Sequence, residues 1–332
     1  MAVLSNGVKK REKMRLERGV REKSTVKYFA TIFLLLLLVM GMVLPQGARS
    51  LVIHVMIFCI LAMGYDISLG FTNQCSLGHS VFFGIGAYGA VLSILHLHVG
   101  FLPSLFFSLL GGFILGTLTG FISVRLSEAY FVIVTAIFFG VFHLLAMDMT
   151  WLTGGDDGLS VNLQTLSVGG ISISLYDQRV NYYFVLVFLI LSYLALDRII
   201  RSPMGKVFVS IRENEKRVQF LGYNVYRYKL IAFIVSGVFS ALSGGLYGLT
   251  LRYGSADFFS FHWSIMPVVW CLIGGLGTLA GPWIGVVIMS LFQYYVSAWW
   301  TYYLILFGII ILLILRVSRK GILGYVVSRR LL

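Results

Sequence analysis

The sequence predicts an all-α polytopic membrane protein with about ten transmembrane helices, some of them interrupted or re-entrant. Three observations carry this prediction: the composition, the frequency of glycine and the clustering of basic residues. Of the 332 residues, 58% are hydrophobic and 12% are charged, whereas soluble chains carry about 25% charged residues. A soluble fold of this length has too little interior for so many apolar side chains. The composition therefore excludes an ordinary soluble enzyme, a disordered protein and a secreted disulfide scaffold, and the 36 glycines are typical of membrane helices.

The 26 lysines and arginines are clustered, and the clusters predict the topology. Short loops rich in Lys and Arg stay in the cytoplasm, so we expect both termini and the central basic loop to lie inside. The resulting segments are a basic cytoplasmic tail (1–27), a first transmembrane block of six spans (28–200) with an external loop (150–181), a cytoplasmic loop (201–228), a second block of four spans (229–316) and a basic cytoplasmic C-terminus (317–332).

Each expected span is an apolar segment close to the length of about 20 residues that crosses the hydrocarbon core. The stretch 262–300 is too long for one crossing, and its glycine-rich middle divides it into two short helices. An arrangement of eight spans with one re-entrant segment is an alternative. The expected spans are 28–44, 51–70, 81–98, 102–124, 129–149, 182–196, 230–251, the two halves of 262–300, and 301–315.

Glycines spaced four residues apart predict close packing between helices. In lipid there is no hydrophobic drive between helices, so small residues that let two backbones approach stabilise the bundle. Two runs of three such glycines occur in the chain. They are Gly112, Gly116 and Gly120, and Gly277, Gly281 and Gly285.

Two segments interrupt the apolar pattern. The first, 73–80, places polar side chains and glycine between apolar neighbours, and the second, 274–285, is rich in Gly, Thr and Pro. Interrupted helices in both halves of a chain indicate a transport pathway. The alternatives are a plain loop at the membrane surface for the first segment and a tight turn between two short helices for the second. The candidates for the pathway lining are Asn73, Gln74, Ser76 and His79.

The sequence contains no recognisable motif for ATP binding, catalysis or ion coupling. The P-loop pattern is absent, since the Gly205-Lys206 pair has Ile200 at the position of the first glycine. The three cysteines lack metal-ligand spacing, no span carries the ionisable relay of a proton-coupled pump, and no hydrolase motif occurs. We therefore expect no catalytic residue, metal or cofactor in this chain, and a partner that supplies the energy.

The central loop, 201–228, is where such a partner would dock. It combines charged residues with a partly amphipathic apolar pattern, and Gly222 is a plausible helix stop. Because the loop is too short for a domain with its own core, we expect a short helix lying on a partner's surface. A basic loop without a partner is the alternative. The candidate coupling residues are Arg212, Glu213, Glu215, Lys216 and Gly222.

Four stretches resemble a known family, the membrane permease subunit of bacterial branched-chain amino-acid ABC importers (the LivM-type family). The resemblance extends over roughly 60–320 and implies the ABC importer permease fold. The stretches are Gln74-Cys75-Ser76-Leu77-Gly78-His79 into Phe82-Phe83-Gly84-Ile85-Gly86-Ala87-Tyr88; Thr153-Gly154-Gly155-Asp156-Asp157-Gly158-Leu159; Arg201-Ser202-Pro203-Met204-Gly205 through Ile211-Arg212-Glu213-Asn214-Glu215 and Leu221-Gly222, then Tyr228-Lys229; and Gly274-Gly275-Leu276-Gly277-Thr278 with Gly281-Pro282.

The resemblance implies a complex in the bacterial inner (plasma) membrane. Its members would be this chain, a second related permease and two ABC ATPase subunits, which use ATP and dock on the 201–228 loop. An extracytoplasmic solute-binding protein would dock near Asp156 and Asp157. Membrane lipid is a further partner, with the tail 1–27 either an amphipathic helix on anionic lipid or a disordered topogenic tail; no nucleic acid is expected. The alternatives are an importer for urea, amides or other amino acids, a stand-alone secondary transporter, and a membrane enzyme or scaffold.

Overall fold

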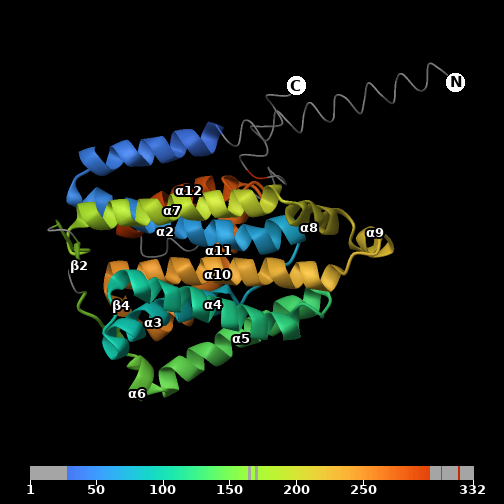
Figure 1. The fold of residues 1–332 in the computed structure, drawn as a ribbon, viewed down its shortest axis with the longest axis horizontal. Helices are drawn as coiled ribbons and strands as arrows, with labels where there is room; N and C mark the ends of the chain where they lie inside the picture. The colour runs from blue at the N-terminus through green and yellow to red at the C-terminus, as the bar shows by residue number, and fades with distance from the viewer. Residues whose placement is uncertain (1–27, 164–165, 169–170, 300–307, 309–320, 322–332) are drawn as a thin grey trace.

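The computed structural model describes residues 28–163, 166–168 and 171–299, together with Gly308 and Gly321. In this part the chain forms a bundle of long helices that run roughly alongside one another (Figure 1). The expected span 301–315 and the basic tails 1–27 and 317–332 lie outside the described residues, apart from the two isolated glycines.

Six helices of the described part are long and apolar enough to cross a membrane, so the chain is a multi-pass membrane protein. Further helices cover Tyr28–Val43, α11 (Phe261–Gly274) and α12 (Gly281–Trp299). The structure therefore supports a polytopic helical membrane protein, and the count of ten spans stays a prediction. The six long helices are α2 with its π-helical end (Gln46–Phe71), α3 (His79–Leu97), α4 (Phe101–Ser123), α5 (Glu128–Asp148), α7 (Gln178–Arg201) and α10 (Val225–Leu251).

The starts of α2 and α7 differ from those expected. α2 starts at Gln46, directly after Pro45, so the turn expected over 45–50 is shorter than predicted. α7 starts at Gln178 because the Asp177 side chain accepts the backbone N–H of Arg179 at 2.8 Å. The first residues of α7 therefore come from the expected external loop 150–181.

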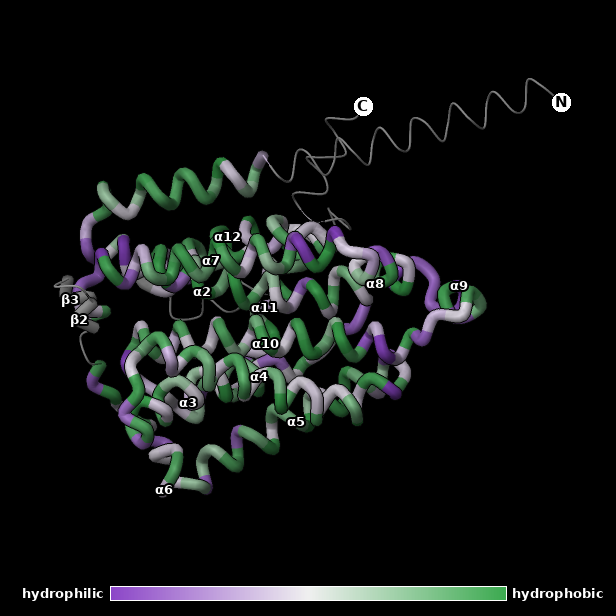
Figure 2. Tube along the Cα trace, in the orientation of Figure 1, coloured by the Kyte–Doolittle hydropathy of each residue, from purple (hydrophilic) through white to green (hydrophobic). Residues whose placement is uncertain are grey.

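Helix α10 lies in the centre of the bundle. It packs against α2 on one side and against α3 and α4 on the other, while α5 lies at the edge (Figure 1). In the most apolar window of α2, 78% of the residues are buried, against 17% for α5. Hydrophobic residues extend along all these helices and hydrophilic ones gather at the two ends of the bundle (Figure 2). The outer helices therefore expose apolar faces suited to lipid or to another membrane subunit.

The two ends of the bundle carry different short elements. Two helices, α8 (Pro203–Glu213) and α9 (Glu215–Phe220), form one end, and the antiparallel strand pairs lie at the opposite end (Figure 1). Arg125 stacks over Tyr226 at the α8–α9 end. The elements of the strand end are α6 (Thr150–Thr153), β1 (Leu159–Ser160) paired with β4 (Tyr253–Gly254), β2 (Leu166–Val168) paired with β3 (Ile171–Ile173), and the 3-10 helix η2 (Ala256–Phe259).

Candidate functional site

The helical path breaks between α2 and α3. The last turn of α2 is a π-helix, Ile67–Phe71, and the irregular segment 72–78 follows it. π-helical turns are frequent at functional sites. The break is held by hydrogen bonds: the Ser68 hydroxyl donates to the Gln74 carbonyl at 3.0 Å, and the Gln74 N–H donates to the Ser68 carbonyl at 2.8 Å. The chain thus leaves the helix without leaving its backbone groups unpaired.

The segment 72–78 turns back into the bundle. The Leu77 N–H donates to the Thr135 hydroxyl at 3.1 Å, and Thr135 lies about two turns inside α5. His79 Nε2 lies 2.7 Å from the Ser236 hydroxyl, about three turns inside α10. Helix α3 therefore starts within the bundle. Protein therefore covers the irregular backbone of this segment.

The expected pathway residues have different surroundings. Asn73 is exposed and adopts a left-handed conformation with φ 59°, whereas Gln74, Ser76 and His79 are buried. The Ser76 carbonyl accepts the hydroxyl of Tyr65 at 2.9 Å, and the His79 ring meets the edge of the Tyr65 ring at 4.5 Å. Ser76 and His79 thus fix the start of α3 within the core, while Asn73 and Gln74 face a cavity.

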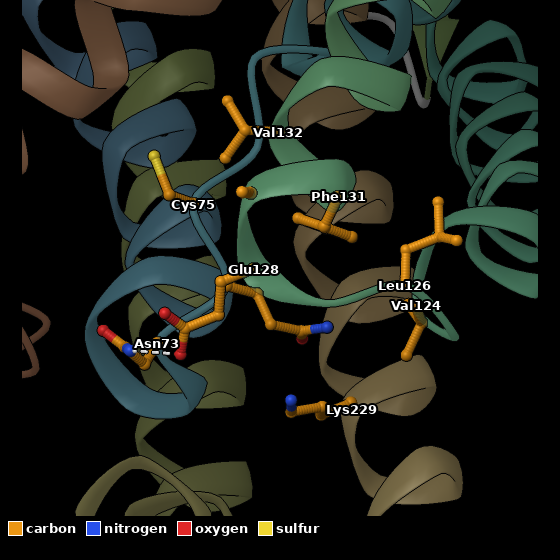
Figure 3. A pocket seen from close by; sticks show the side chains of 10 residues that line it. Asn73, Cys75, Val124, Leu126, Glu128, Phe131, Val132 and Lys229 are labelled. Atoms are coloured by element: carbon orange, nitrogen blue, oxygen red, sulfur yellow. Dashed lines mark hydrogen bonds between the residues drawn. The ribbon is translucent and has the colours of Figure 1, made fainter.

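The cavity has a volume of about 290 Å³ and combines polar and apolar walls. Asn73 Nδ2 donates to Glu128 Oε1 at 3.2 Å, and Lys229 projects from α10 toward the same space (Figure 3). Cys75 also lines it. Sequence reasoning did not select Glu128 or Lys229, because they come from segments far from 73–80 in the chain, and it passed over Cys75 within that segment. The remaining lining residues are Gln74, Val124, Leu126, Ala129, Phe131 and Val132.

Helices α8 and α9 form a compact unit at the same end of the bundle as the cavity. The Ser202 hydroxyl accepts the Gly205 N–H at 3.4 Å at the start of α8, and Asn214 Oδ1 accepts the Arg217 N–H at 2.9 Å at the start of α9. Gly222, with φ 85°, follows α9, and the Tyr223 N–H donates to the Val218 carbonyl at 3.3 Å. This is a Schellman end, in which a left-handed residue stops the helix.

The expected coupling residues point in different directions. Arg212 reaches into the bundle, where its Nη1 donates to the Gly70 carbonyl at 2.6 Å. Glu215 forms an ion pair of 2.6 Å with Lys229, so α9 is attached to a wall of the cavity. Glu213 and Lys216 are exposed. The tip of the unit is apolar, because Phe220 is 90% exposed and Leu221 is 70% exposed.

A second break separates α11 from α12. Asp66, which is fully buried near the end of α2, holds this turn: it accepts the Gly277 N–H at 2.9 Å and the Leu279 N–H at 3.3 Å. Gly277 lies in the turn with φ 72°, so it does not share one helical stripe with Gly281 and Gly285 as the spacing predicted. The spacing failed here because the helix begins only at Gly281.

A comparison with known proteins identifies the family. A family model described as "branched-chain amino acid transport system / permease component" matches residues 47–315. The chain belongs to this permease family. No solved structure matches the chain.

Individual relatives of this permease-family chain carry the names LivM and LivH. The high-affinity branched-chain amino acid transport system permease protein LivM of Salmonella typhimurium is 29% identical over 279 residues, which is 77% of this chain and 65% of that protein. The probable LivM of Methanocaldococcus jannaschii is 26% identical over 230 residues, 64% of this chain and 65% of that protein. LivH of Salmonella typhimurium is 22% identical over 297 residues, 80% of this chain and 91% of that protein. The chain thus spans somewhat less than two thirds of the LivM relatives it matches.

The glycine run of α4 in this permease-family chain faces α10. A side-chain carbon at Gly112 would contact Ala241, and one at Gly116 would contact Ile234. At Gly120 it would contact Leu230. The three glycines thus lie at a close helix contact.

Asp156 and Asp157 lie in the turn before β1, at the strand end of the bundle. Both are exposed, and the Tyr253 hydroxyl donates to the Asp157 carbonyl at 2.5 Å. The described residues contain no group of three or more His, Cys, Asp or Glu side chains that could hold a metal ion.

Proposed function

We propose that this chain is the permease subunit of an ABC importer for branched-chain amino acids or closely related solutes. Membership of the permease family and the names of the LivM and LivH relatives support the class of solute. One observation of geometry carries the mechanism: helix α8 contacts the π-helical end of α2, directly before the segment 72–78, through the 2.6 Å bond from Arg212 to Gly70.

The α8–α9 unit is the docking element for partner ATPases in this proposal. It lies in the cytoplasm, in agreement with the basic residues between Arg198 and Lys229. Phe220 and Leu221 project at its tip, and large exposed apolar side chains surrounded by charge are typical of a site for a protein partner. ATP is bound and hydrolysed by the partners, and their motion reaches this chain through the unit.

The opposite end of the bundle is the external face. A solute-binding protein delivers the solute there, near the turn with Asp156 and Asp157, and a second related permease completes the pathway. The cavity lined by Asn73, Glu128 and Lys229 belongs to the inner part of this pathway. Its charged and apolar walls suit an aliphatic amino acid, which has two charges and an apolar side chain.

A stand-alone transporter driven by an ion gradient is less compatible with the site. Such a transporter needs intramembrane carboxylates that bind the coupling ion. The buried Asp66 uses both carboxylate oxygens to accept backbone N–H groups. It therefore serves the fold and not an ion.

The experiment that tests this function is uptake by the complete complex. The tagged full-length chain is purified from its own membrane with its partners and reconstituted in vesicles with the solute-binding protein. We expect labelled leucine to enter only with ATP on the side of the α8–α9 unit. Uptake by the chain alone, or uptake driven by an ion gradient without ATP, would contradict the proposal.

A further inference from the structure

We propose that Arg212, Gly70, Asp66 and Gly277, here called the α8 joint, make helix α8 and the segment 72–78 move as one body. Arg212 and Asp66 are the positioning residues of this joint. The inference rests on the proposed function and adds the means by which motion of the end helices reaches the cavity.

The first contact of the joint is the bond from Arg212. Its guanidinium extends from the last turn of α8 and donates to the Gly70 carbonyl at 2.6 Å. Gly70 lies in the last turn of the π-helix, where carbonyl groups lack an N–H partner further along the helix. A charged donor therefore meets an acceptor that the helix end leaves free. Bonds of this kind are among the stronger hydrogen bonds in proteins.

The second contact ties the α11–α12 turn to the same place. The Asp66 carboxylate is fully buried, and an isolated buried charge is costly unless it is hydrogen-bonded. Its two bonds from the Gly277 and Leu279 N–H groups meet this need and hold the turn against the end of α2.

The two glycines show how closely the three elements meet. A side-chain carbon at Gly70 would collide with Asp66 Oδ1 and with the Gly277 nitrogen. One at Gly277 would collide with Arg212 Nη1 and with the Gly70 carbonyl. The end of α2, the end of α8 and the α11–α12 turn thus converge at one point, with no space for even a methyl group.

The joint continues into the wall of the cavity. Gly70 lies between Ser68 and Gln74, which are joined by two hydrogen bonds of 2.8 and 3.0 Å, so a displacement of Gly70 is passed to Gln74 and Cys75. The opposite wall is attached to α9 through the ion pair of Glu215 and Lys229. Motion of the α8–α9 unit therefore acts on two walls of the cavity through two separate contacts.

The native cysteines provide a direct readout of the joint. The chain has three, of which Cys59 and Cys271 are buried and Cys75 is half-buried beside the cavity. The full-length chain in nanodiscs is reacted with a charged methanethiosulfonate reagent, and the labelling rate of Cys75 is measured by mass spectrometry. The variant is Arg212→Ala. The matched control is Arg217→Ala, which removes an equally exposed arginine of the same unit whose side chain is not part of the joint.

We expect Arg212→Ala to raise the labelling rate of Cys75 by about tenfold or more, the factor that loss of a hydrogen bond to a charged group gives in a local opening equilibrium. Arg217→Ala should leave the rate unchanged, and Arg212→Lys, which keeps a charged donor, should restore part of the protection. Asp66→Asn, combined with Arg212→Ala, should give an effect that differs from the product of the single effects, because the two side chains meet where Gly70 and Gly277 pack together. Equal rates for Arg212→Ala and Arg217→Ala would overturn the joint.

A second measurement separates the joint from the proposed function. In the reconstituted complex, Arg212→Ala should raise the number of ATP molecules hydrolysed per solute transported, at an unchanged amount of assembled complex. An unchanged ratio in a complex that does transport with ATP would overturn the joint and leave the function standing. Faster Cys75 labelling in a complex that transports without ATP would support the joint and contradict the function.

Discussion

The two breaks in the helical path arise from similar sequence signals and have opposite structures. The break at 72–78 is polar: side-chain hydroxyl and amide groups pair with its backbone, and a cavity lies beside it. The break between α11 and α12 also has a side chain on its backbone, the Asp66 carboxylate, but its two helices close with glycine against backbone, Gly274 at the Gly281 carbonyl and Gly285 at the Trp270 carbonyl. A cavity of about 290 Å³ borders the first break, whereas the glycine contacts of the second leave no space for an added side chain. We therefore expect the first break to be able to open the cavity beside it, and the second to keep α11 and α12 together.

The largest effect is expected where the second break is forced apart. Gly285→Leu would place a side chain on the Trp270 carbonyl, and overpacking of this kind costs about 3 kcal/mol. The α11–α12 hairpin would not close, and the fraction of monodisperse chain after heating in detergent should fall sharply.

Gly140→Leu is the matched control. It adds the same side chain to a glycine in the middle of α5, and no heavy atom of the described chain lies within 4 Å of the added carbon. Leucine also has a higher helix propensity than glycine, so this variant should be as stable as the parent. Equal losses in both variants would show that the second break is not a close backbone contact.

The next largest effect is expected at the tip of α9, through which the partner ATPases would act on the first break. Phe220→Asp together with Leu221→Asp places two charges on the exposed tip of α9, and loss of a central apolar contact lowers the affinity of a protein partner by about 2 kcal/mol or more. Transport-coupled ATP hydrolysis of the complex should therefore fall by tenfold or more on the same scale, while the isolated chain keeps its thermal stability.

Gln219→Ala is the control. It changes an exposed residue of the same helix and should leave the rate of ATP hydrolysis unaltered. If the double aspartate variant hydrolyses ATP at the normal coupled rate, the tip of α9 does not dock the ATPase.

A smaller effect is expected at the contact between the start of α3, directly after the first break, and α11, the helix that precedes the second. The Ser264 hydroxyl, in α11, accepts the Ser80 N–H at 3.1 Å and donates to the Ser80 hydroxyl at 2.8 Å. Ser264→Ala leaves a buried N–H without this partner, at a cost of about 1–2 kcal/mol in the free energy of unfolding. A denaturation series in detergent should show it.

Thr117→Ala also removes a hydroxyl, but that hydroxyl bonds only the Phe113 carbonyl within its own helix. Its cost should lie below that of Ser264→Ala. The reverse order would mean that the two breaks are not tied through α11.

The sequence reveals the breaks more readily than their differences. Long apolar segments predict the helices, and the left-handed stop at Gly222 follows from its position after an amphipathic pattern. The burial of Asp66, the inward reach of Arg212 and the position of Glu128 and Lys229 on one cavity depend on contacts between segments far apart in the chain. Local patterns carry no information on such contacts. Sequence reasoning therefore placed Arg212 on a docking surface and did not find its contact with Gly70.

The smallest effect is expected at the backbone of the first break. Asn73 and Leu279 both adopt positive φ, 59° and 51°, and each lies in one of the two breaks. Asn73 is exposed, so Asn73→Gly removes one surface hydrogen bond and relieves a left-handed residue, and the free energy of unfolding should change by less than about 0.5 kcal/mol. Leu279 is buried, so Leu279→Gly loses an apolar side chain, and relief of its left-handed conformation offsets part of this loss, which leaves a cost of about 2 kcal/mol. Equal costs at the two positions, measured by denaturation in detergent, would contradict the distinction between an opening break and a holding one.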